Sequence, residues 1–78
     1  MKRAIATTHI SEMFEDIELA EVDGMYVVRV EQSVYGWEER EFDEYAAASD
    51  LYIDAVASAV AGGDALNLVA NARTGRHL

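Results

Sequence analysis

The dipeptide Asp23-Gly24 lies between two segments in which apolar and polar residues alternate, and it constrains the fold more than any other feature of the chain. A two-residue type I′ turn needs positive φ at both central positions, and Asp-Gly accommodates this readily. Closing such a turn pairs Val22 with Met25 and sets the register of the strands behind it. Because the hydrophobic pattern agrees with that register, the sequence predicts a β-hairpin here.

This register sorts the side chains of the hairpin onto two faces. On the buried side the expected pairs are Leu19 with Val28 and Ile17 with Val30, and on the open side Glu18 with Arg29 and Asp16 with Glu31. The hairpin therefore carries its apolar residues on one face and its charges on the other.

A second turn is predicted at Tyr35-Gly36-Trp37. A three-residue loop there places Phe42 opposite Val30 on the buried side, whereas a two-residue turn would send carboxylates into the core at high cost. On the open side the same register sets Arg29 beside Asp43 and Glu31 beside Glu41. A short first strand, around Arg3 to Thr8, completes the predicted antiparallel sheet.

After Phe42-Asp43 the hydrophobic period changes from two to about 3.6, which indicates helices. We expect them over residues about 45–61 and 65–73, with Asp43 or Ser49 capping the first, Gly62-Gly63 ending it, Asp64 capping the second and Gly75 ending that. Arg73 and Arg76 then lie where the helix dipole favours cations. The predicted fold is a single α+β domain over 1–78: an antiparallel sheet of three to four strands (about 3–44) with two C-terminal α-helices packed on one face.

The charge distribution limits the kinds of molecule that the chain is expected to bind. Fifteen acids oppose six bases, and every acid lies between Glu12 and Asp64, where Arg29 and Arg40 are the only bases. The net charge of −9 argues against binding a phosphate backbone, which requires clustered Lys and Arg. It favours a basic partner or simply solubility.

Catalytic and cofactor motifs are missing from the sequence. There is no cysteine and no nucleotide-binding glycine motif. His9 and Glu12 have a spacing that suits two ligands on a helix, but two ligands do not make a zinc site. We therefore expect neither an enzyme, nor a cofactor, nor a metal, and Trp37 near a loop tip is a candidate for protein contact. The lack of cysteine, export signal and long apolar segment predicts a protein of a reducing cytosol.

The order of several short segments resembles the small phage-encoded anti-CRISPR proteins that inhibit the type I-F surveillance complex. The segments are TTHISEM, DIEL, DG, VRVEQSVYG and EFDE. The most specific elements are Arg29-Val30-Glu31 followed by Val34 and Gly36, and then Phe42-Asp43 leading into the first helix. The similarity spans most of the first 44 residues, and the helices match only in placement.

The resemblance implies a four-stranded antiparallel sheet with two helices on one face, and no catalysis. Proteins of that family bind the repeated backbone subunits that display the guide RNA, and so block target DNA from pairing with it in the cytoplasm of the infected host. They use the outer sheet face, through exposed aromatics and one strand acid. Glu31 matches that acid, while Ala6 and Ala20 stand where the aromatics are expected. The predicted partner-binding residues are Asp16, Glu18, Ala20, Arg29, Glu31, Trp37 and Glu41.

Two other functions fit parts of the sequence. One is an antitoxin that neutralises a basic toxin, although the chain lacks the basic DNA-binding segment that antitoxins often carry. The other is an acidic DNA mimic aimed at a nuclease, although Arg29 and Arg40 interrupt the carboxylates. Val22, Met25 and Val27 form a small apolar strip that suits either a partner or a dimer, and the sequence leaves both the subtype of the complex and the oligomeric state open.

Overall fold

The computed structural model describes residues 1–72, without the side chain of Met13. Four strands form one antiparallel sheet in the order β1-β2-β3-β4, and two helices follow it in the chain. The strands are β1 (Lys2–Ile10), β2 (Glu15–Val22), β3 (Met25–Gln32) and β4 (Gly36–Phe42), with a 3₁₀ turn η1 (Ser11–Met13) between the first two, and the helices are α1 (Tyr45–Val60) and α2 (Ala65–Ala70).

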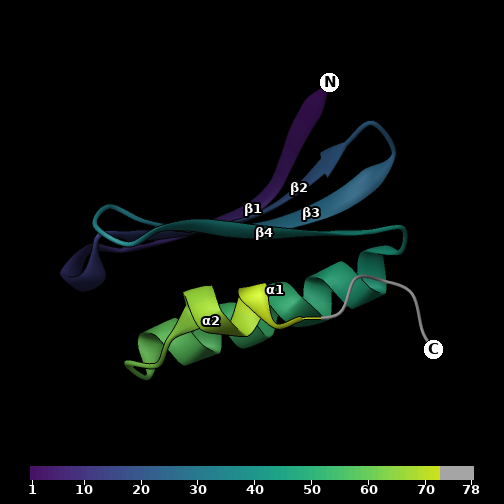
Figure 1. The fold of residues 1–78 in the computed structure, drawn as a ribbon. Coiled ribbons are helices and arrows are strands. Elements are labelled where there is room, and N and C mark those ends of the chain that lie inside the picture. The colour runs from purple at the N-terminus through teal and green to yellow at the C-terminus, as the bar shows by residue number, and fades with distance from the viewer. Residues whose placement is uncertain (73–78) are drawn as a thin grey trace.

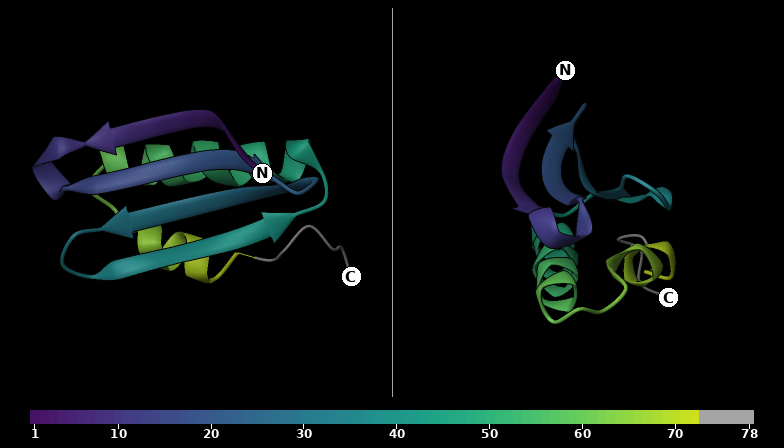
Figure 2. Two further views of the ribbon diagram at one scale, coloured as in Figure 1. Left: turned by 90° about the horizontal axis from the view of Figure 1, so that it is seen from above. Right: turned by 90° about the vertical axis from the view of Figure 1, so that its left-hand side faces the viewer.

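The sheet and the helices form two layers, with both helices below the same face of the sheet (Figure 1). Figure 2 shows α1 under the side of β1 and β2, and α2 under the side of β3 and β4. The predicted α+β class and its layer arrangement are confirmed. The first strand was predicted around Arg3 to Thr8 and runs from Lys2 to Ile10, and the sheet ends at Phe42 where about residue 44 was predicted. The first helix ends at Val60 where about residue 61 was predicted, and the predicted end of the second helix at residue 73 lies outside the described residues.

The β2–β3 hairpin has the predicted turn and register. Asp23 and Gly24 have φ of 52° and 84°, as a type I′ turn requires. Val22 faces Met25, and the four pairs predicted behind the turn are all present. Alternation and turn chemistry specified this register together, because a slip of one residue would turn the apolar side chains to the other face.

The predicted register of β3 with β4 is wrong by four residues. The loop is Ser33-Val34-Tyr35, which joins Gln32 to Gly36, and Phe42 faces Tyr26 instead of Val30. Because the shift is even, Phe42 still points into the core. The observed register sets Arg29 opposite Glu39, and it avoids the predicted apposition of Glu31 with Glu41. Like charges directly opposite each other destabilise a sheet, which is the physical reason we assign to the difference.

A single core lies between the layers. Its fully or nearly fully buried side chains are Ile17, Leu19, Val28, Val30, Phe42, Ala48, Leu51, Ala55, Ala59, Ala65 and Val69. The small alanines of α1 let that helix approach the sheet closely. At one end of the core the rings of Tyr26 and Tyr45 meet edge to face, with centroids 5.7 Å apart.

The junction between the helices follows the predicted signals in part. Gly62 has φ of 82° after α1, and the Asp64 carboxylate accepts a hydrogen bond of 3.1 Å from the Asn67 N–H, so Asp64 is the N-cap of α2. The N-cap of α1 is Glu44, not Asp43 or Ser49, since Ser49 lies inside the helix.

The C-terminal end of α2 is held by the sheet. The Arg40 guanidinium donates a hydrogen bond to the carbonyl of Ala70 and another, of 2.7 Å, to the carbonyl of Glu39. Arg40 thus ties the last turn of α2 to β4. The predicted roles of Arg73, Gly75 and Arg76 lie outside the described residues.

A bulge in β1 corrects one sequence expectation. The register of β1 with β2 shifts between Ala4 and Ala6, because Ile5 is an extra residue. Ala6 therefore faces Leu19 and packs against the core, and Ala4 faces Ala20 on the other side of the sheet. The prediction that Ala6 lies on the outer face is wrong. Across residues 1–72, no helix is long and apolar enough to cross a membrane.

Candidate functional site

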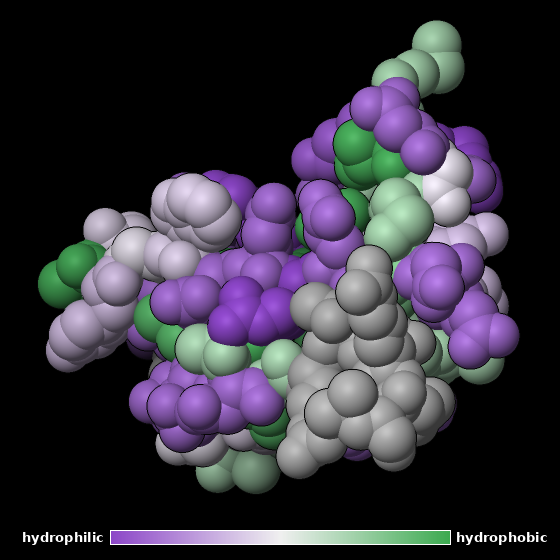
Figure 3. Space-filling model, turned by 45° about the vertical axis from the view of Figure 1, so that its right-hand side comes forward, coloured by the Kyte–Doolittle hydropathy of each residue, from purple (hydrophilic) through white to green (hydrophobic). Residues whose placement is uncertain are grey.

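The sheet face that points away from the helices is the candidate site, and we call it the outer face. Within residues 1–72 neither helix covers it (Figure 1). Hydrophilic surface extends over much of the molecule in Figure 3. The outer face consists of Lys2, Ala4, Thr7, His9, Asp16, Glu18, Ala20, Val22, Met25, Val27, Arg29, Glu31, Trp37, Glu39 and Glu41.

Polar contacts connect neighbouring strands across the outer face. Lys2 Nζ lies 2.7 Å from Glu18 Oε1, and His9 Nδ1 lies 2.7 Å from Asp16 Oδ1. Both contacts join β1 to β2. Exposed pairs of this kind contribute little stability, but they fix the direction in which each carboxylate points.

Arg29 occupies the centre of the charged part of the face. Its guanidinium lies 3.4 Å from Glu39 Oε1 and 3.7 Å from Glu31 Oε1, and it stacks over the Trp37 ring at 4.2 Å from the centroid. Cation–π stacking of this geometry is favourable. One cation therefore organises three neighbouring side chains on β3 and β4.

Asp16 and Glu31 stand directly opposite each other on β2 and β3. Side chains so placed have Cβ atoms about 5 Å apart, and like charges there are unfavourable. Both carboxylates are more than half exposed; Asp16 contacts the His9 ring, and the Arg29 guanidinium lies 3.7 Å from Glu31 Oε1. The outer face thus holds two negative charges side by side with incomplete compensation, a place suited to a cation from another molecule.

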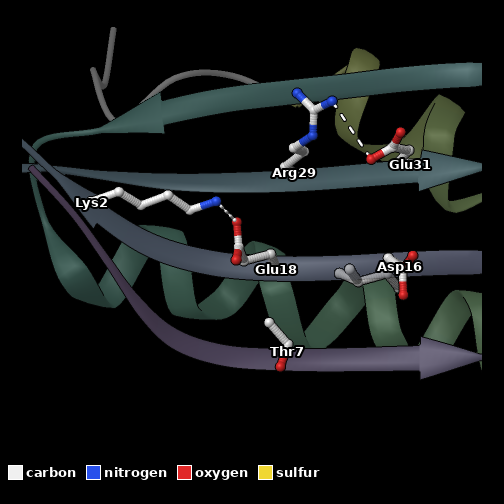
Figure 4. Close-up of a pocket in the computed structure, with 7 residues that line it drawn as sticks. Lys2, Thr7, Asp16, Glu18, Arg29 and Glu31 are labelled. Carbon is white, nitrogen blue, oxygen red and sulfur yellow. Dashed lines mark ion pairs between the residues drawn. The ribbon is translucent and has the colours of Figure 1, made fainter.

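A shallow depression of about 300 Å³ lies along this pair. Its lining residues are Lys2, Thr7, Asp16, Ile17, Glu18, Arg29 and Glu31. In Figure 4 Lys2 reaches toward Glu18 and Arg29 toward Glu31. The sheet therefore brings together four of the predicted site residues, Asp16, Glu18, Arg29 and Glu31.

The other predicted site residues are placed less centrally. Ala20 lies on the outer face but is almost fully buried, so it offers little surface to a partner. Glu41 is exposed opposite Val27, toward the end of β4, and Trp37 lies at the start of β4 opposite Glu31. Asp43, which was expected on this face, follows β4 in a bend.

Several residues of the face were missed from the sequence. The spacing of His9 and Glu12 suited two metal ligands, but His9 contacts Asp16 instead. The residues that the structure describes contain no group of three or more His, Asp or Glu that could hold a metal ion. Lys2 was missed because it precedes the predicted first strand, and Glu39 because the predicted β3–β4 register placed Asp43 beside Arg29. Alternation in residues 2–9 was the one available signal, and the bulge at Ile5 obscures it.

A further ion pair lies at the N-terminal end of β1, next to Lys2. The Arg3 guanidinium donates to Glu21 Oε1 from Nε at 3.2 Å and from Nη2 at 2.6 Å. This hydrogen bond and the charge of Glu21 raise the pKa of Arg3 above its usual value. The contact holds β1 against β2 where both strands leave the helices.

No protein-family model matches the chain, and no curated protein or solved structure matches it significantly.

Proposed function

We propose that this protein is an anti-CRISPR inhibitor that binds the backbone subunits of a type I CRISPR surveillance complex through its outer face. Bound there, it blocks hybridisation of target DNA to the guide RNA. It acts by occupying a surface and not by catalysis, in the cytoplasm of the infected bacterial host. The resemblance of short segments within most of the first 44 residues to the type I-F inhibitors and the charge of the outer face support this proposal.

The observation that carries the proposal is the apposition of Asp16 and Glu31. A lysine or arginine of the partner that enters between them gains two charge-assisted hydrogen bonds and relieves the repulsion within the free protein. Subunits that hold a guide RNA present such basic side chains, because binding a phosphate backbone requires them. Glu18 and Glu39 extend the acidic area on either side.

The charge also explains how binding could exclude DNA. Complementary potentials accelerate encounter and discriminate between partners more than they add affinity. Once bound, a domain of net charge −9 both covers basic surface and repels an approaching DNA backbone. The proposed mechanism is therefore occlusion combined with repulsion.

The test is binding of the purified protein to reconstituted type I complexes of several subtypes, together with a mobility-shift assay of target DNA. We expect a stable complex with at least one subtype, and that complex should fail to bind target DNA. No binding to any subtype would remove the proposal and direct attention to basic toxins and nucleases.

The variant Glu31→Lys tests the surface. It places a lysine opposite Asp16, so it converts a repulsive pair into an attractive one, while it removes the contact of Glu31 with Arg29, and urea unfolding checks that the variant is folded. We expect it to weaken binding by roughly tenfold or more and to flatten the salt dependence. The matched control is Asp54→Lys, which makes the same charge change at an exposed position of α1, on the other layer. Equal effects of the two variants would show that only net charge matters.

A further inference from the structure

Four exposed apolar side chains gather at one end of the sheet, and we call them the aromatic end. They are Phe14, Val34, Tyr35 and Trp37, exposed by 67%, 80%, 80% and 54%. Phe14 follows η1 between β1 and β2, and the other three belong to the β3–β4 connection and the start of β4. Both connections lie at the same end of the sheet (Figure 1). The left-hand end in Figure 3 projects and mixes green with pale surface.

The two connections are bonded to each other through the backbone. The Ser33 N–H donates to the Phe14 carbonyl at 3.3 Å, and the Phe14 N–H donates to the Ser11 carbonyl at 3.3 Å. The aromatic end is therefore one platform supported by both turns. The Arg29 guanidinium, 4.2 Å from the centroid of the Trp37 ring, holds that ring in place at the start of β4.

Phe14 has a backbone conformation that an aromatic residue rarely adopts. Its φ and ψ are 49° and 47°, in the left-handed region, which glycine and asparagine occupy at much lower cost. Burial of the ring does not offset this strain, because Phe14 is largely exposed. Strain of this kind concentrates at functional sites, and here it directs an aromatic side chain into solvent.

The surroundings of the aromatic end determine the kind of partner it fits. Acidic residues lie around the aromatic end. Glu31 stands opposite Trp37, Glu38 follows Trp37, and Glu12 precedes Phe14 by two residues. Among the described residues, Arg29 contacts Trp37 and already pairs with Glu39 and Glu31, and Arg40 lies 3.7 Å from Glu38, so each of these cations already has an acidic partner. Apolar side chains inside an acidic rim fit an apolar pocket with a basic rim, and they repel nucleic acid.

Two hollows adjoin the aromatic end on the side of α2. They have volumes of about 360 Å³ and about 240 Å³, and Tyr35 and Leu66 border both. The end therefore offers projecting side chains together with recesses that can receive a side chain of the partner. Projecting side chains beside recesses allow the close shape complementarity found at the centre of protein interfaces.

We propose that the aromatic end is a second docking surface, which inserts Phe14, Val34 and Tyr35 into an apolar, basic-rimmed pocket of the same protein that the outer face contacts. This inference rests on the proposed function. The stack of Arg29 on Trp37 makes the two surfaces continuous. Aromatic anchors of this type dominate binding energy in protein interfaces, whereas the acids chiefly set specificity and the rate of encounter.

The experiment compares Phe14→Asn/Val34→Ser/Tyr35→Ser with the wild type against the type I complexes. Asparagine tolerates the left-handed conformation, so the backbone is retained, and urea unfolding followed by Trp37 fluorescence checks that the variant is folded. The single variant Tyr35→Ser provides a second reading if the triple variant is unstable. The matched control is Ile53→Ser/Val60→Ser, which removes exposed apolar side chains from α1.

We expect the triple variant to dissociate roughly tenfold faster or more, with an unchanged salt dependence, and the α1 control to bind as the wild type does. Glu31→Lys should differ from the triple variant, because it changes a charge and therefore also flattens the salt dependence of binding. If the wild type binds and the triple variant binds equally well, the inference fails and the proposed function stands. If the wild type binds none of the complexes, both fail.

Discussion

The Arg29 guanidinium lies 4.2 Å from the centre of the Trp37 ring, with Glu39 Oε1 3.4 Å from its Nη1. This stack joins the acidic outer face to the apolar residues at the end of the sheet. A strand pairing that slipped by two residues would separate Arg29 from Glu39, so the stack also depends on the β3–β4 register. The two proposed contact surfaces are thus coupled through one side chain.

Replacing Arg29 by methionine should reveal that coupling. Trp37 is the only tryptophan, so its emission reports on the stack directly. We expect Arg29→Met to change the emission of the folded protein and to lower the free energy of unfolding by about 1 kcal/mol. The control is Lys2→Met, which breaks the pair with Glu18 between β1 and β2 on the same face of the sheet. An emission change in the control as large as in Arg29→Met would contradict the assignment.

Removing one member of the repulsive carboxylate pair should have opposite effects on stability and on binding. Asp16→Asn keeps an oxygen for His9 but removes the charge that faces Glu31, so the free energy of unfolding should rise by about 0.2–1 kcal/mol. Urea unfolding measures this change. Glu41→Gln is the control, because Glu41 faces the uncharged Val27. Binding to the proposed partner should weaken for Asp16→Asn, and equal stability of the two variants would argue against repulsion.

The buried carboxyl of Glu15 predicts an unusual pattern of stability. Glu15 is fully buried, its Oε2 accepts a hydrogen bond of 2.8 Å from Gln32 Nε2, and its Oε1 has no partner among the described residues. Gln32→Leu should cost about 1–3 kcal/mol, because it leaves the carboxyl without that donor. Glu15→Met/Gln32→Leu should recover most of the loss or exceed the wild type. Urea unfolding measures the free energy of unfolding of both variants. A double variant as unstable as the single variant would contradict this account.

Arg40 should control the attachment of α2. The helix has six residues, too few to persist without tertiary contacts, and Arg40 holds its last carbonyl. We expect Arg40→Gln to increase amide hydrogen exchange in residues 65–70 while the amides of β2 and β3 keep their protection. Uniform loss of protection over the whole sheet would instead mean that Arg40 supports global stability.

The fold was predictable where local signals were strong. Asp23-Gly24 and the alternation on both sides of it specified the β2–β3 register, and with it the apposition of Asp16 and Glu31. The change of period after Phe42 located the helices, and Asp64 was recognisable as a cap. These signals act within a few residues of the chain, so propensity and turn geometry suffice to read them.

Tertiary structure decided the features that depend on pairs of residues far apart. The observed β3–β4 register sets Arg29 opposite Glu39 rather than Asp43 and keeps Glu31 away from Glu41, and the bulge at Ile5 decided that Ala6 enters the core. The joining of Phe14 to Ser33 arises from two turns that are neighbours only in the folded sheet. The sequence by itself determined the alternating hairpin, the helices and the acidity of the chain, because these are local or additive. Which charges and aromatic rings share a surface was decided by strand pairing, because a shift by an even number of residues changes every cross-strand neighbour while each side chain keeps its face of the sheet.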